Sequence, residues 1–568
     1  MPPGPTPTPA SSVSGIVPTP TPHATGSGLP TPPPTPTPIG PPTPTPSPAA
    51  FNDFPTYGYD NARSGFNPNT TQITPQSIGS LKKVWVDDFA DFNLQSQPVL
   101  ATNITDAHGT LHAGVLFVGG GNASVKAVDA FTGAIVWSAQ LQQGMYHCGP
   151  PPAPAIPFGI PGTFAYDGSR GLIYVADGVH TIHALNVANG AEAWRVDVAP
   201  GANDASDLHQ FLHTGLLLQG NELYAGTGST CDITPWDGRI VQVDVASHTL
   251  VGSFYPVRDA APGIKYSGGG VWGWGAASTD GANLFLGIGN ADTNSPAAPG
   301  YNVAPSETTG FGEQVVELSS NLTFESSVLP ISSAMFNPPN VVDTDMSGTP
   351  IVFRPVDCPH NYIASQGKAG FLTIEDVSNG IGQPIARIQL SLTSDASNYI
   401  GNPAFSPVTN LLYAAEATAV GSYRPGMALI AHSPGCGSWS VVMNPVFGPD
   451  SAQPPYNDGN SHPRSAPTVT AGGVAFMGAP DGVMYAVDAS SGAVLPWNSG
   501  PETGTANHGD LRAAATVDGD WVFVITGRGV LAAYSIDPAF TTHSILRPGP
   551  FQRPANAPPV GPRTMPHR

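Results

Sequence analysis

The stretch AVDAFTGAIVW, residues 127–137, recurs along the chain and decides its fold. It returns as ALNVANGAEAW at residues 184–194 and as AVDASSGAVLPW at residues 486–497. Each copy has an Asp or Asn, a Gly four positions later and a Trp eight or nine positions later. The carboxylate or amide can accept backbone N–H groups of a turn, and the glycine can adopt the positive φ of a tight hairpin. Each copy therefore predicts a hairpin whose outer strand begins near the tryptophan.

The spacing of these copies predicts the architecture. Asp129, Asn186 and Asp244 follow one another at steps of 57 and 58 residues, which suits a sheet of four short strands with its loops. Weaker copies occur at residues 315–319, 371–380, 427–431 and 530–537. We therefore expect an all-β fold, an eight-bladed β-propeller of four-stranded antiparallel sheets. Seven blades are the alternative, because the copies near 427 and 530 are degenerate.

Residues 81–89 have strand character and carry Trp85, but no partner strand precedes them. In a closed propeller the first strand commonly completes the last blade and leaves no open sheet edge. We expect this N-terminal strand to close the ring.

The composition agrees with an all-β class and excludes one class of partner. The chain has 66 Gly and 64 Pro but only 11% charged residues, so it is rich in turns and poor in surface helices. Its 20 basic and 40 acidic residues give a net charge of −20, which repels phosphate backbones. No nucleic acid partner is expected.

Three parts are expected along the chain. Residues 1–50 form a Pro/Thr-rich tract without Asp, Glu, Lys or Arg, which favours polyproline II and cannot build a core. We expect a disordered stalk there, with a passive tail as the alternative, the propeller over residues 51–540, and a Pro/Arg-rich disordered tail over 541–568. No signal peptide is visible and no run of eighteen apolar residues occurs, so no membrane span is expected.

Polar residues gather in the loops that should open on one face of the propeller. The stretch GGGVWGWGAASTDGANLFLGIGN, residues 268–290, reads as two antiparallel strands with a turn at Thr279-Asp280-Gly281, so Trp272 and Asn290 should meet at one end of a sheet. The same face should carry His147, Cys148, His209, His213, Cys231, Asp232, Asp292, Lys368, His462, Arg464, His508, Asp510 and Arg512. His209 and His213 would face one way only on a helix, and a strand is expected there. We therefore interpret these histidines as hydrogen-bonding groups rather than zinc ligands.

The stretch 268–290 and the repeats resemble the pyrroloquinoline quinone (PQQ) dehydrogenase family. The resemblance implies that Trp272 forms the floor under the quinone and that Asn290 binds the Ca²⁺ beside it. VVDTDMSGTPIVF, residues 341–353, resembles the segment whose first aspartate contacts Ca²⁺ and acts as general base, which implies Asp343, with Asp345 as its neighbour. QGKAGFLTIED, residues 366–376, resembles the segment whose lysine hydrogen-bonds the quinone oxygens, which implies Lys368.

The chain departs from the family pattern at two places. Ile233 stands where the family supplies a glutamate ligand to Ca²⁺, and the adjacent Asp232 is the candidate substitute. His147-Cys148 stands where many members carry two consecutive cysteines, so no vicinal disulfide can form there. Four cysteines allow three pairings, and Cys148 with Cys231 is preferred because both are expected on one face of successive blades. No C-x-x-C-H motif occurs, so covalent haem is not expected and electrons would leave to a separate acceptor.

Two functions follow from the resemblance. The first is a PQQ- and Ca²⁺-dependent dehydrogenase of a small alcohol. The second is a non-catalytic propeller that binds a surface polymer or a protein, because the family also includes outer-membrane assembly lipoproteins that bind no quinone. Both imply an extracytoplasmic location, inferred from the stalk and the fold.

Overall fold

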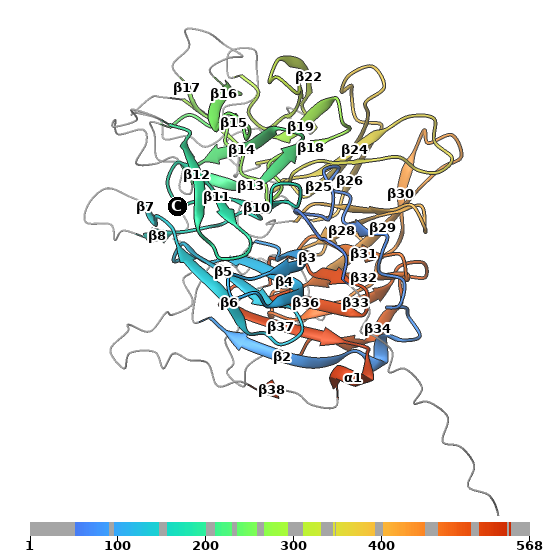
Figure 1. Ribbon diagram of the computed structural model, residues 1–568. Coiled ribbons are helices and arrows are strands. Elements are labelled where there is room, and N and C mark those ends of the chain that lie inside the picture. The colour runs from blue at the N-terminus through green and yellow to red at the C-terminus, as the bar shows by residue number, and fades with distance from the viewer. Residues whose placement is uncertain are drawn as a thin grey trace, which may run out of the picture. The chain divides into compact units, whose positions relative to one another are not determined.

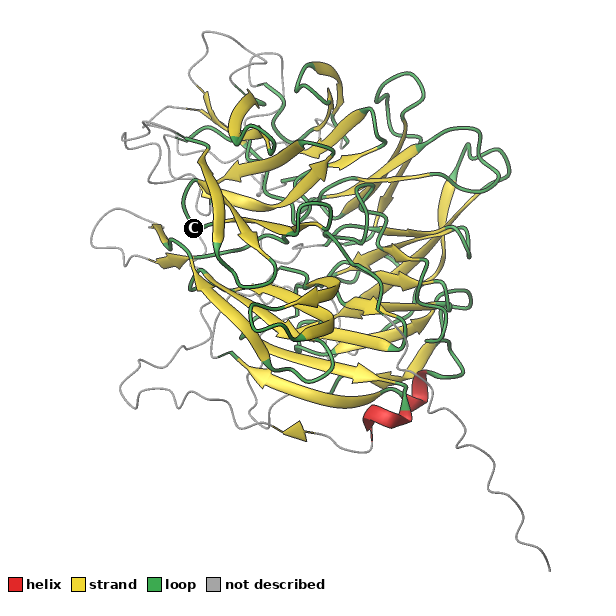
Figure 2. Cartoon of the chain, viewed as in Figure 1, coloured by secondary structure: helices red, strands yellow, loops and turns green. Residues whose placement is uncertain are grey.

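The computed structural model describes most of the predicted propeller. The described residues are 51–89, 96–146, 156–199, 211–229, 236–257, 266–293, 310–330, 345–346, 348–391, 401–448, 464–500, 511–541 and 545–546. The predicted stalk, residues 1–50, lies outside them, as does the predicted tail apart from residues 541 and 545–546. Strands dominate the described part, where α1 (Pro538–Thr541) is the α-helix and η1 (Ile78–Ser80) a short 3₁₀ helix (Figure 2). No described helix has the length and apolar character needed to cross a membrane.

Eight sheets, each built on four antiparallel strands, make up an eight-bladed β-propeller, as predicted (Figure 1). The four strands are consecutive in the chain in blades 1 to 7, and blade 8 takes its fourth strand from the N-terminus. Strands are given from the innermost outward. Blade 1 consists of β3 (Val99–Thr105), β4 (Leu111–Gly119), β5 (Ser124–Asp129) and β6 (Ile135–Gln140). Blade 2 consists of β9 (Ala165–Asp167), β10 (Leu172–Ala176), β11 (Thr181–Asn186) and β12 (Glu192–Asp197), and blade 3 of β13 (Phe211–Gln219), β14 (Glu222–Gly228), β15 (Arg239–Asp244) and β16 (Thr249–Phe254).

Blades 4 to 6 continue the pattern. Blade 4 consists of β18 (Ser278–Thr279), β19 (Asn283–Gly287), β21 (Val315–Ser319) and β22 (Phe324–Val328). Blade 5 consists of β23 (Ile351–Phe353), β24 (Tyr362–Gln366), β25 (Phe371–Asp376) and β26 (Ala386–Gln389). Blade 6 consists of β27 (Ala404–Ser406), β28 (Leu411–Glu416), β29 (Gly426–His432) and β30 (Trp439–Met443).

Blade 7 is β31 (Thr468–Thr470), β32 (Val474–Gly478), β33 (Met484–Asp488) and β34 (Val494–Asn498), with β1 (Phe66–Asn67) parallel to β31. Blade 8 combines β35 (Thr516–Asp518), β36 (Trp521–Ile525) and β37 (Val530–Ser535) with β2 (Lys82–Asp88). Two small sheets lie outside the blades and pair β7 (Gly144–Tyr146) with β8 (Ile156–Phe158), and β17 (Tyr266–Gly268) with β20 (Ala291–Thr293).

The N-terminal strand closes the ring, as the sequence predicts. β2 pairs antiparallel with β37, so a strand from residues 82–88 completes a sheet whose other strands begin at residue 516. A short strand, β38 (Ile545–Leu546), within the tail that was expected to be disordered, pairs in parallel with the outer side of β2. Its pairing satisfies backbone groups at an edge that would otherwise face solvent.

The repeated Asp, Gly and Trp join the hairpins of blades 1 and 2 to the preceding blade. Asp129 Oδ1 accepts the N–H groups of Phe131 and Thr132 at 3.1 and 2.8 Å, and Gly133 has φ +72°. The Trp85 indole of blade 8 donates to the Ala130 carbonyl at 2.9 Å. A Cβ added to Gly133 would lie 2.8 Å from the Trp85 ring, so this position requires glycine for its contact as well as for its conformation.

The same contact recurs from blade 1 to blade 2, where Trp137 donates to the carbonyl of Val187 at 2.7 Å. The apolar core likewise consists of clusters that each lie between two blades. Each of the eight largest clusters of buried side chains combines residues of two adjacent blades, including blades 8 and 1. Each blade therefore buries both faces only within a complete ring.

Residues 52–67, called here the axial segment, bind the innermost strands of all eight blades. Carbonyl oxygens of the segment accept backbone N–H groups from six inner strands at 2.7 to 3.0 Å: Phe54 from Leu100, Pro55 from Tyr166, Asn61 from Thr279, Ala62 from Val352, Ser64 from Phe405 and Gly65 from Val469. Side chains reach the other two blades, since Asn61 donates to the Leu218 carbonyl and Asn67 to the Val517 carbonyl. The segment passes the blades in ring order and satisfies the inner strand edges.

Arg63 anchors the axial segment. Its side chain is 1% exposed, and all five N–H groups are donated: Nε to the Ala277 carbonyl, Nη1 to Thr56 Oγ1 and the Tyr57 carbonyl, and Nη2 to the carbonyls of Leu216 and Gly275. Burial lowers the pKa of the Arg63 guanidinium to about 10, with Asp60 acting against that shift. The group therefore stays charged at neutral pH while it joins the segment to blades 3 and 4.

A disulfide between Cys358 and Cys436 links blades 5 and 6. Of the three possible pairings of four cysteines, the one that contains this bond leaves Cys148 and Cys231 to each other. Both of these cysteines lie outside the described residues, so the preferred pairing stays a prediction.

Replacing Arg63 by Met should lower the free energy of unfolding by about 3 kcal/mol or more, because five buried acceptors lose their donors. Chemical denaturation followed by near-UV circular dichroism measures the change. Arg195, whose side chain is 67% exposed, supplies the control variant Arg195→Met, which should stay within about 0.5 kcal/mol of the parent. Equal effects of the two substitutions would contradict the anchoring role.

Glu375 of β25 should make stability fall as pH rises. Its side chain is fully buried, and burial raises its pKa to about 8 against the opposing effects of Thr373 and Arg387. The folded chain holds this proton above the unfolded pKa of 4.5, so the stabilisation is complete below that value and is lost as pH rises through about 8. Glu375→Gln should flatten the decline in melting temperature between about pH 5 and pH 9, whereas the exposed-site control Glu325→Gln should not.

Candidate functional site

The residues around Trp272 and Asn290 return to one end of blade 4, as predicted. Gly269 donates its N–H to the Asn290 carbonyl at 2.6 Å, and Gly289 donates to the Gly270 carbonyl at 2.8 Å. The predicted turn also forms, with Asp280 Oδ1 accepting the N–H groups of Ala282 and Asn283.

The prediction of two continuous strands over residues 268–290 is wrong in one respect. Trp272 lies in a loop between β17 and β18 rather than on a strand. Gly268 and Gly269 have φ values of +99° and +71°, which end β17 and turn the chain before the tryptophan. β17 and β20 then pair as a separate small sheet.

Glycines allow the backbone to approach the Trp272 ring. A Cβ added to Gly289 would lie 2.7 Å from Asp345 Oδ1 and 3.0 Å from Trp272 Nε1. Cβ atoms added to Gly228 or Gly270 would each lie 3.2 Å from Trp272 atoms. Gly289, the residue before Asn290, therefore has to be small for the indole and the carboxylate to lie against the same loop.

Asp345 joins blade 4 to blade 5. Its Oδ1 accepts the backbone N–H of Asn290 at 2.6 Å, and its backbone carbonyl accepts the N–H of Lys368 at 2.8 Å. Its Oδ2 accepts from Lys368 Nζ at 2.6 Å. The side chains of Lys368 and Asp345 are 12% and 8% exposed, so this is a largely buried ion pair.

The Lys368 ammonium also lies over the face of Trp272, with Nζ 4.9 Å from the ring centroid. Trp272 is partly exposed and Asn290 is 1% exposed. A cation, a carboxylate, an amide residue and an aromatic face thus come together from residues 272, 290, 345 and 368. Such a set can bind a flat ligand by its face and an oxyanion by the ammonium.

The structure covers only part of the predicted site. Trp272, Asn290 and Lys368 are described and converge, and Asp345 joins them. The predicted base Asp343 and the predicted Ca²⁺ ligand Asp232 lie outside the described residues, as do His147, Cys148, His209, Cys231, His462, His508 and Asp510 and the side chains of His213 and Asp292. Arg464 is described and buried, and it donates to the Phe447 carbonyl at 3.2 Å.

Sequence reasoning understated two residues of this site. The family resemblance implies Asp345 only as a neighbour of Asp343, whereas in the structure the Asp345 carboxylate is the direct partner of Lys368. Gly289 was not singled out, although GIGN contains it directly before Asn290. The sequence feature that could indicate Gly289 is its position directly before a predicted Ca²⁺ ligand.

Comparisons with known proteins identify the fold. Residues 82–252 match the PQQ_2 family model, described as outer membrane protein assembly factor BamB. The solved quinohemoprotein alcohol dehydrogenase of Comamonas testosteroni is 16% identical over 85% of this chain and 80% of its own, with a TM-score of 0.57. The chain has the fold of the PQQ-like β-propeller family.

Two further structures share this PQQ-like propeller fold. Quinohemoprotein alcohol dehydrogenase ADHIIG of Pseudomonas putida HK5 is 15% identical, covering 88% of this chain and 82% of its own, with a TM-score of 0.60. A europium-containing methanol dehydrogenase is 14% identical, covering 85% and 98%, with a TM-score of 0.58. No curated protein sequence matches the chain. At these identities the likeness is one of fold.

Removing one partner of the Lys368–Asp345 pair from this PQQ-like propeller should cost more than removing both. Asp345→Ala leaves a buried ammonium without its carboxylate and should lower the free energy of unfolding by about 3 to 5 kcal/mol. The double variant Asp345→Ala/Lys368→Met should recover part of that loss, as a double-mutant cycle by chemical denaturation would measure. Additive losses would show that the two side chains are not coupled.

Proposed function

We propose that the chain is an extracytoplasmic quinoprotein that oxidises a small alcohol with PQQ and Ca²⁺ and passes the electrons to a separate acceptor. One observation carries the proposal. The family resemblance selects Trp272 and Asn290 from residues 268–290 and Lys368 from residues 366–376, and all three lie together with Asp345 at one place in the fold.

The described residues suit the chemistry of the quinone. PQQ is a flat ring system with several carboxylates, and the site offers an indole face for stacking and an ammonium for an anionic oxygen. Asp345 balances the charge of Lys368 and keeps the ammonium beside the ring. Asn290 would contribute an amide oxygen of the kind Ca²⁺ prefers, and Asp343 and Asp232 are the further oxygen ligands that we propose.

Each residue has a distinct role in the proposed reaction. The bound quinone would supply the hydride acceptor. Asp343 would take the hydroxyl proton of the alcohol, since a carboxylate is the general base that the family pattern supplies there. Lys368 would stabilise negative charge on an oxygen of the ring by donating from Nζ. Asp345 acts as a positioning residue, because it holds both the Lys368 ammonium and the Asn290 backbone.

The Cys358–Cys436 disulfide supports the proposed location, since such bonds persist mainly in oxidising compartments. The alternative function is a non-catalytic binding or assembly scaffold. It is favoured by the matched family model, whose description is that of an outer membrane protein assembly factor. That match ends at residue 252, before all four residues of the candidate site.

Reconstitution separates the two functions. Purified chain with saturating PQQ and Ca²⁺ should gain stability on the order of 2.7 kcal/mol at a hundredfold excess over the dissociation constant, and its melting temperature should rise. It should also reduce a dye when an alcohol is added. No thermal shift and no dye reduction would favour the scaffold.

Lys368→Met should abolish both signals while the fold persists by circular dichroism. The matched control is Lys126→Met in blade 1, which removes an ammonium that lies 4.4 Å from the Phe89 ring centroid. The control should retain quinone binding. Loss of binding in both variants would mean that the effect is not specific to the candidate site.

A further inference from the structure

We infer that Cys358, Cys436 and His432 form a binding site for a thiophilic divalent metal ion such as Zn²⁺ once their disulfide is reduced. One potential ligand atom from each of the three residues lies within 4.8 Å of the other two. Among the described residues, these three side chains are the group of His, Cys, Asp or Glu residues whose ligand atoms lie close enough together to hold a metal ion. It lies at the junction of blades 5 and 6. Cys358 precedes β24 and Lys368 follows it, so the cluster and the candidate site lie at opposite ends of that strand, and the inference is independent of the proposed quinone chemistry.

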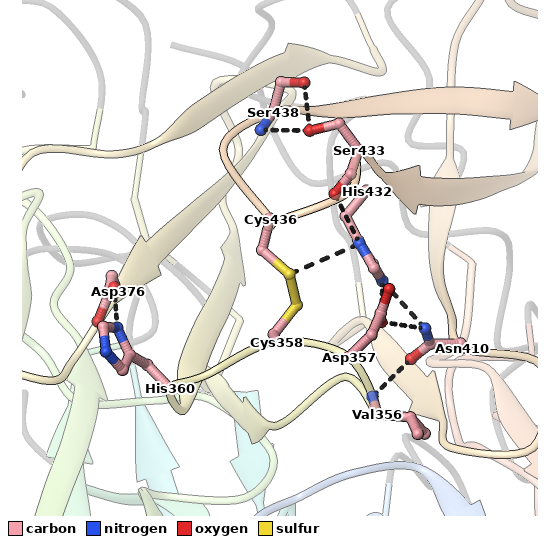
Figure 3. Close-up of a disulfide and its surroundings, with 10 residues drawn as sticks. All are labelled: Val356, Asp357, Cys358, His360, Asp376, Asn410, His432, Ser433, Cys436 and Ser438. Atoms are coloured by element: carbon pink, nitrogen blue, oxygen red, sulfur yellow. Dashed lines mark hydrogen bonds and ion pairs between the residues drawn. A yellow bond between two sulfur atoms is a disulfide. The ribbon is translucent and has the colours of Figure 1, made fainter.

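Two loops and one strand end hold the three side chains together (Figure 3). Cys358 lies between β23 and β24, His432 ends β29, and Cys436 lies four residues later in the turn to β30. The Cα atoms of the two cysteines are 5.9 Å apart, and Cys436 Sγ is 3.6 Å from His432 Nδ1. Because the blades fix both loops, reduction separates the sulfur atoms without removing them from the imidazole.

The three side chains of the proposed site are almost completely buried. Cys358 and Cys436 are 4% and 2% exposed, and the His432 side chain is 6% exposed. Thiolate and imidazole are the ligand types that zinc prefers, and two thiolates with one imidazole leave a fourth position for water. Both thiolates would carry their charge next to the cation rather than alone in a buried place.

The surroundings of His432 provide partners for both of its neutral tautomers. With the proton on Nδ1, the ring donates to the Ser433 carbonyl at 3.0 Å, and Nε2 accepts from Asn410 Nδ2 at 3.0 Å. With the proton on Nε2, the ring donates to Asp357 Oδ1 at 3.2 Å and presents the Nδ1 lone pair toward Cys436. The second arrangement is the carboxylate–histidine pairing that orients metal-bound imidazoles. Asp357 is therefore a positioning residue of the proposed site (Figure 3).

The chemistry balances in two steps. A phosphine reductant and one water convert the disulfide to two thiols and a phosphine oxide. The metal ion then replaces the two thiol protons, and His432 enters as a neutral ligand without proton release. A dithiol can take the place of the phosphine and leaves as its own disulfide. A small-molecule disulfide that takes up two electrons and two protons, and leaves as two thiols, would re-form the Cys358–Cys436 bond and release the metal, so the disulfide and the metal site exclude each other.

Cobalt titration of the full chain tests the proposal. The variant Cys148→Ser/Cys231→Ser removes the other two cysteines and serves as the parent. After phosphine reduction, the parent should bind one Co²⁺, with a thiolate-to-cobalt charge-transfer band and visible bands typical of tetrahedral cobalt, and Zn²⁺ should bleach both. The oxidised parent should show neither band.

Substitutions in the same parent identify the ligands. Cys436→Ser should abolish the charge-transfer band, and His432→Ala should weaken Zn²⁺ binding by at least tenfold. Asp357→Asn should weaken it by about tenfold while the band remains. His360→Ala is the matched control, because His360 pairs with Asp376 nearby and lies outside the cluster; it should bind metal like the parent.

Two results would overturn the inference. One is a cobalt spectrum in the reduced parent that survives Cys436→Ser. The other is a reduced parent that binds no metal, whether it stays folded by circular dichroism or unfolds and is not restored by Zn²⁺. A reduced parent that refolds only when Zn²⁺ is added would support the site, since the metal would then stabilise the folded state.

Discussion

The backbone hydrogen bonds between the axial segment and the inner strands are the constraint on which the propeller depends. In a propeller the innermost strand of each blade has one unpaired edge, and these edges converge on the axis. Here six of those strands donate N–H groups to carbonyls of residues 54–65, and the remaining two are reached by asparagine side chains. One stretch of chain thereby contacts every blade, and the buried Arg63 guanidinium holds it to β13 of blade 3 and to the loop that precedes β18 of blade 4.

A second constraint acts at the outer side of the blades. Tryptophan side chains of one blade donate to the hairpin carbonyl of the next, as Trp85 and Trp137 do, and the hairpin glycine leaves room for the ring. Since the eight largest apolar clusters also span adjacent blades, the described residues of each blade form their core jointly with a neighbouring blade. Because the inner and outer contacts both join a blade to other parts of the ring, each sheet is stable only when the ring is closed.

The candidate site exploits this rigidity. Asp345 and Lys368 belong to blade 5, whereas Trp272 and Asn290 belong to blade 4, so the contacts among them are set by how two blades pack. The Cys358–Cys436 disulfide lies at the next junction, and the packing of blades 5 and 6 sets the distance between its two cysteines. Both clusters place side chains of different loops within hydrogen-bonding distance because the strands beneath them are held in register by many neighbours.

The sequence by itself determined the all-β class, the blade period and the closing strand, because the Asp, Gly and Trp signals act within single hairpins and repeat at a regular interval. It also indicated Trp272, Asn290 and Lys368, since their flanking segments carry a family pattern. Only the tertiary structure decided that residues 52–67 bind the inner strands, that Lys368 pairs with Asp345, and that Cys358 pairs with Cys436 beside His432. These contacts join residues from different blades with no periodic spacing, so nothing local in the chain encodes them; the closed ring brings them together.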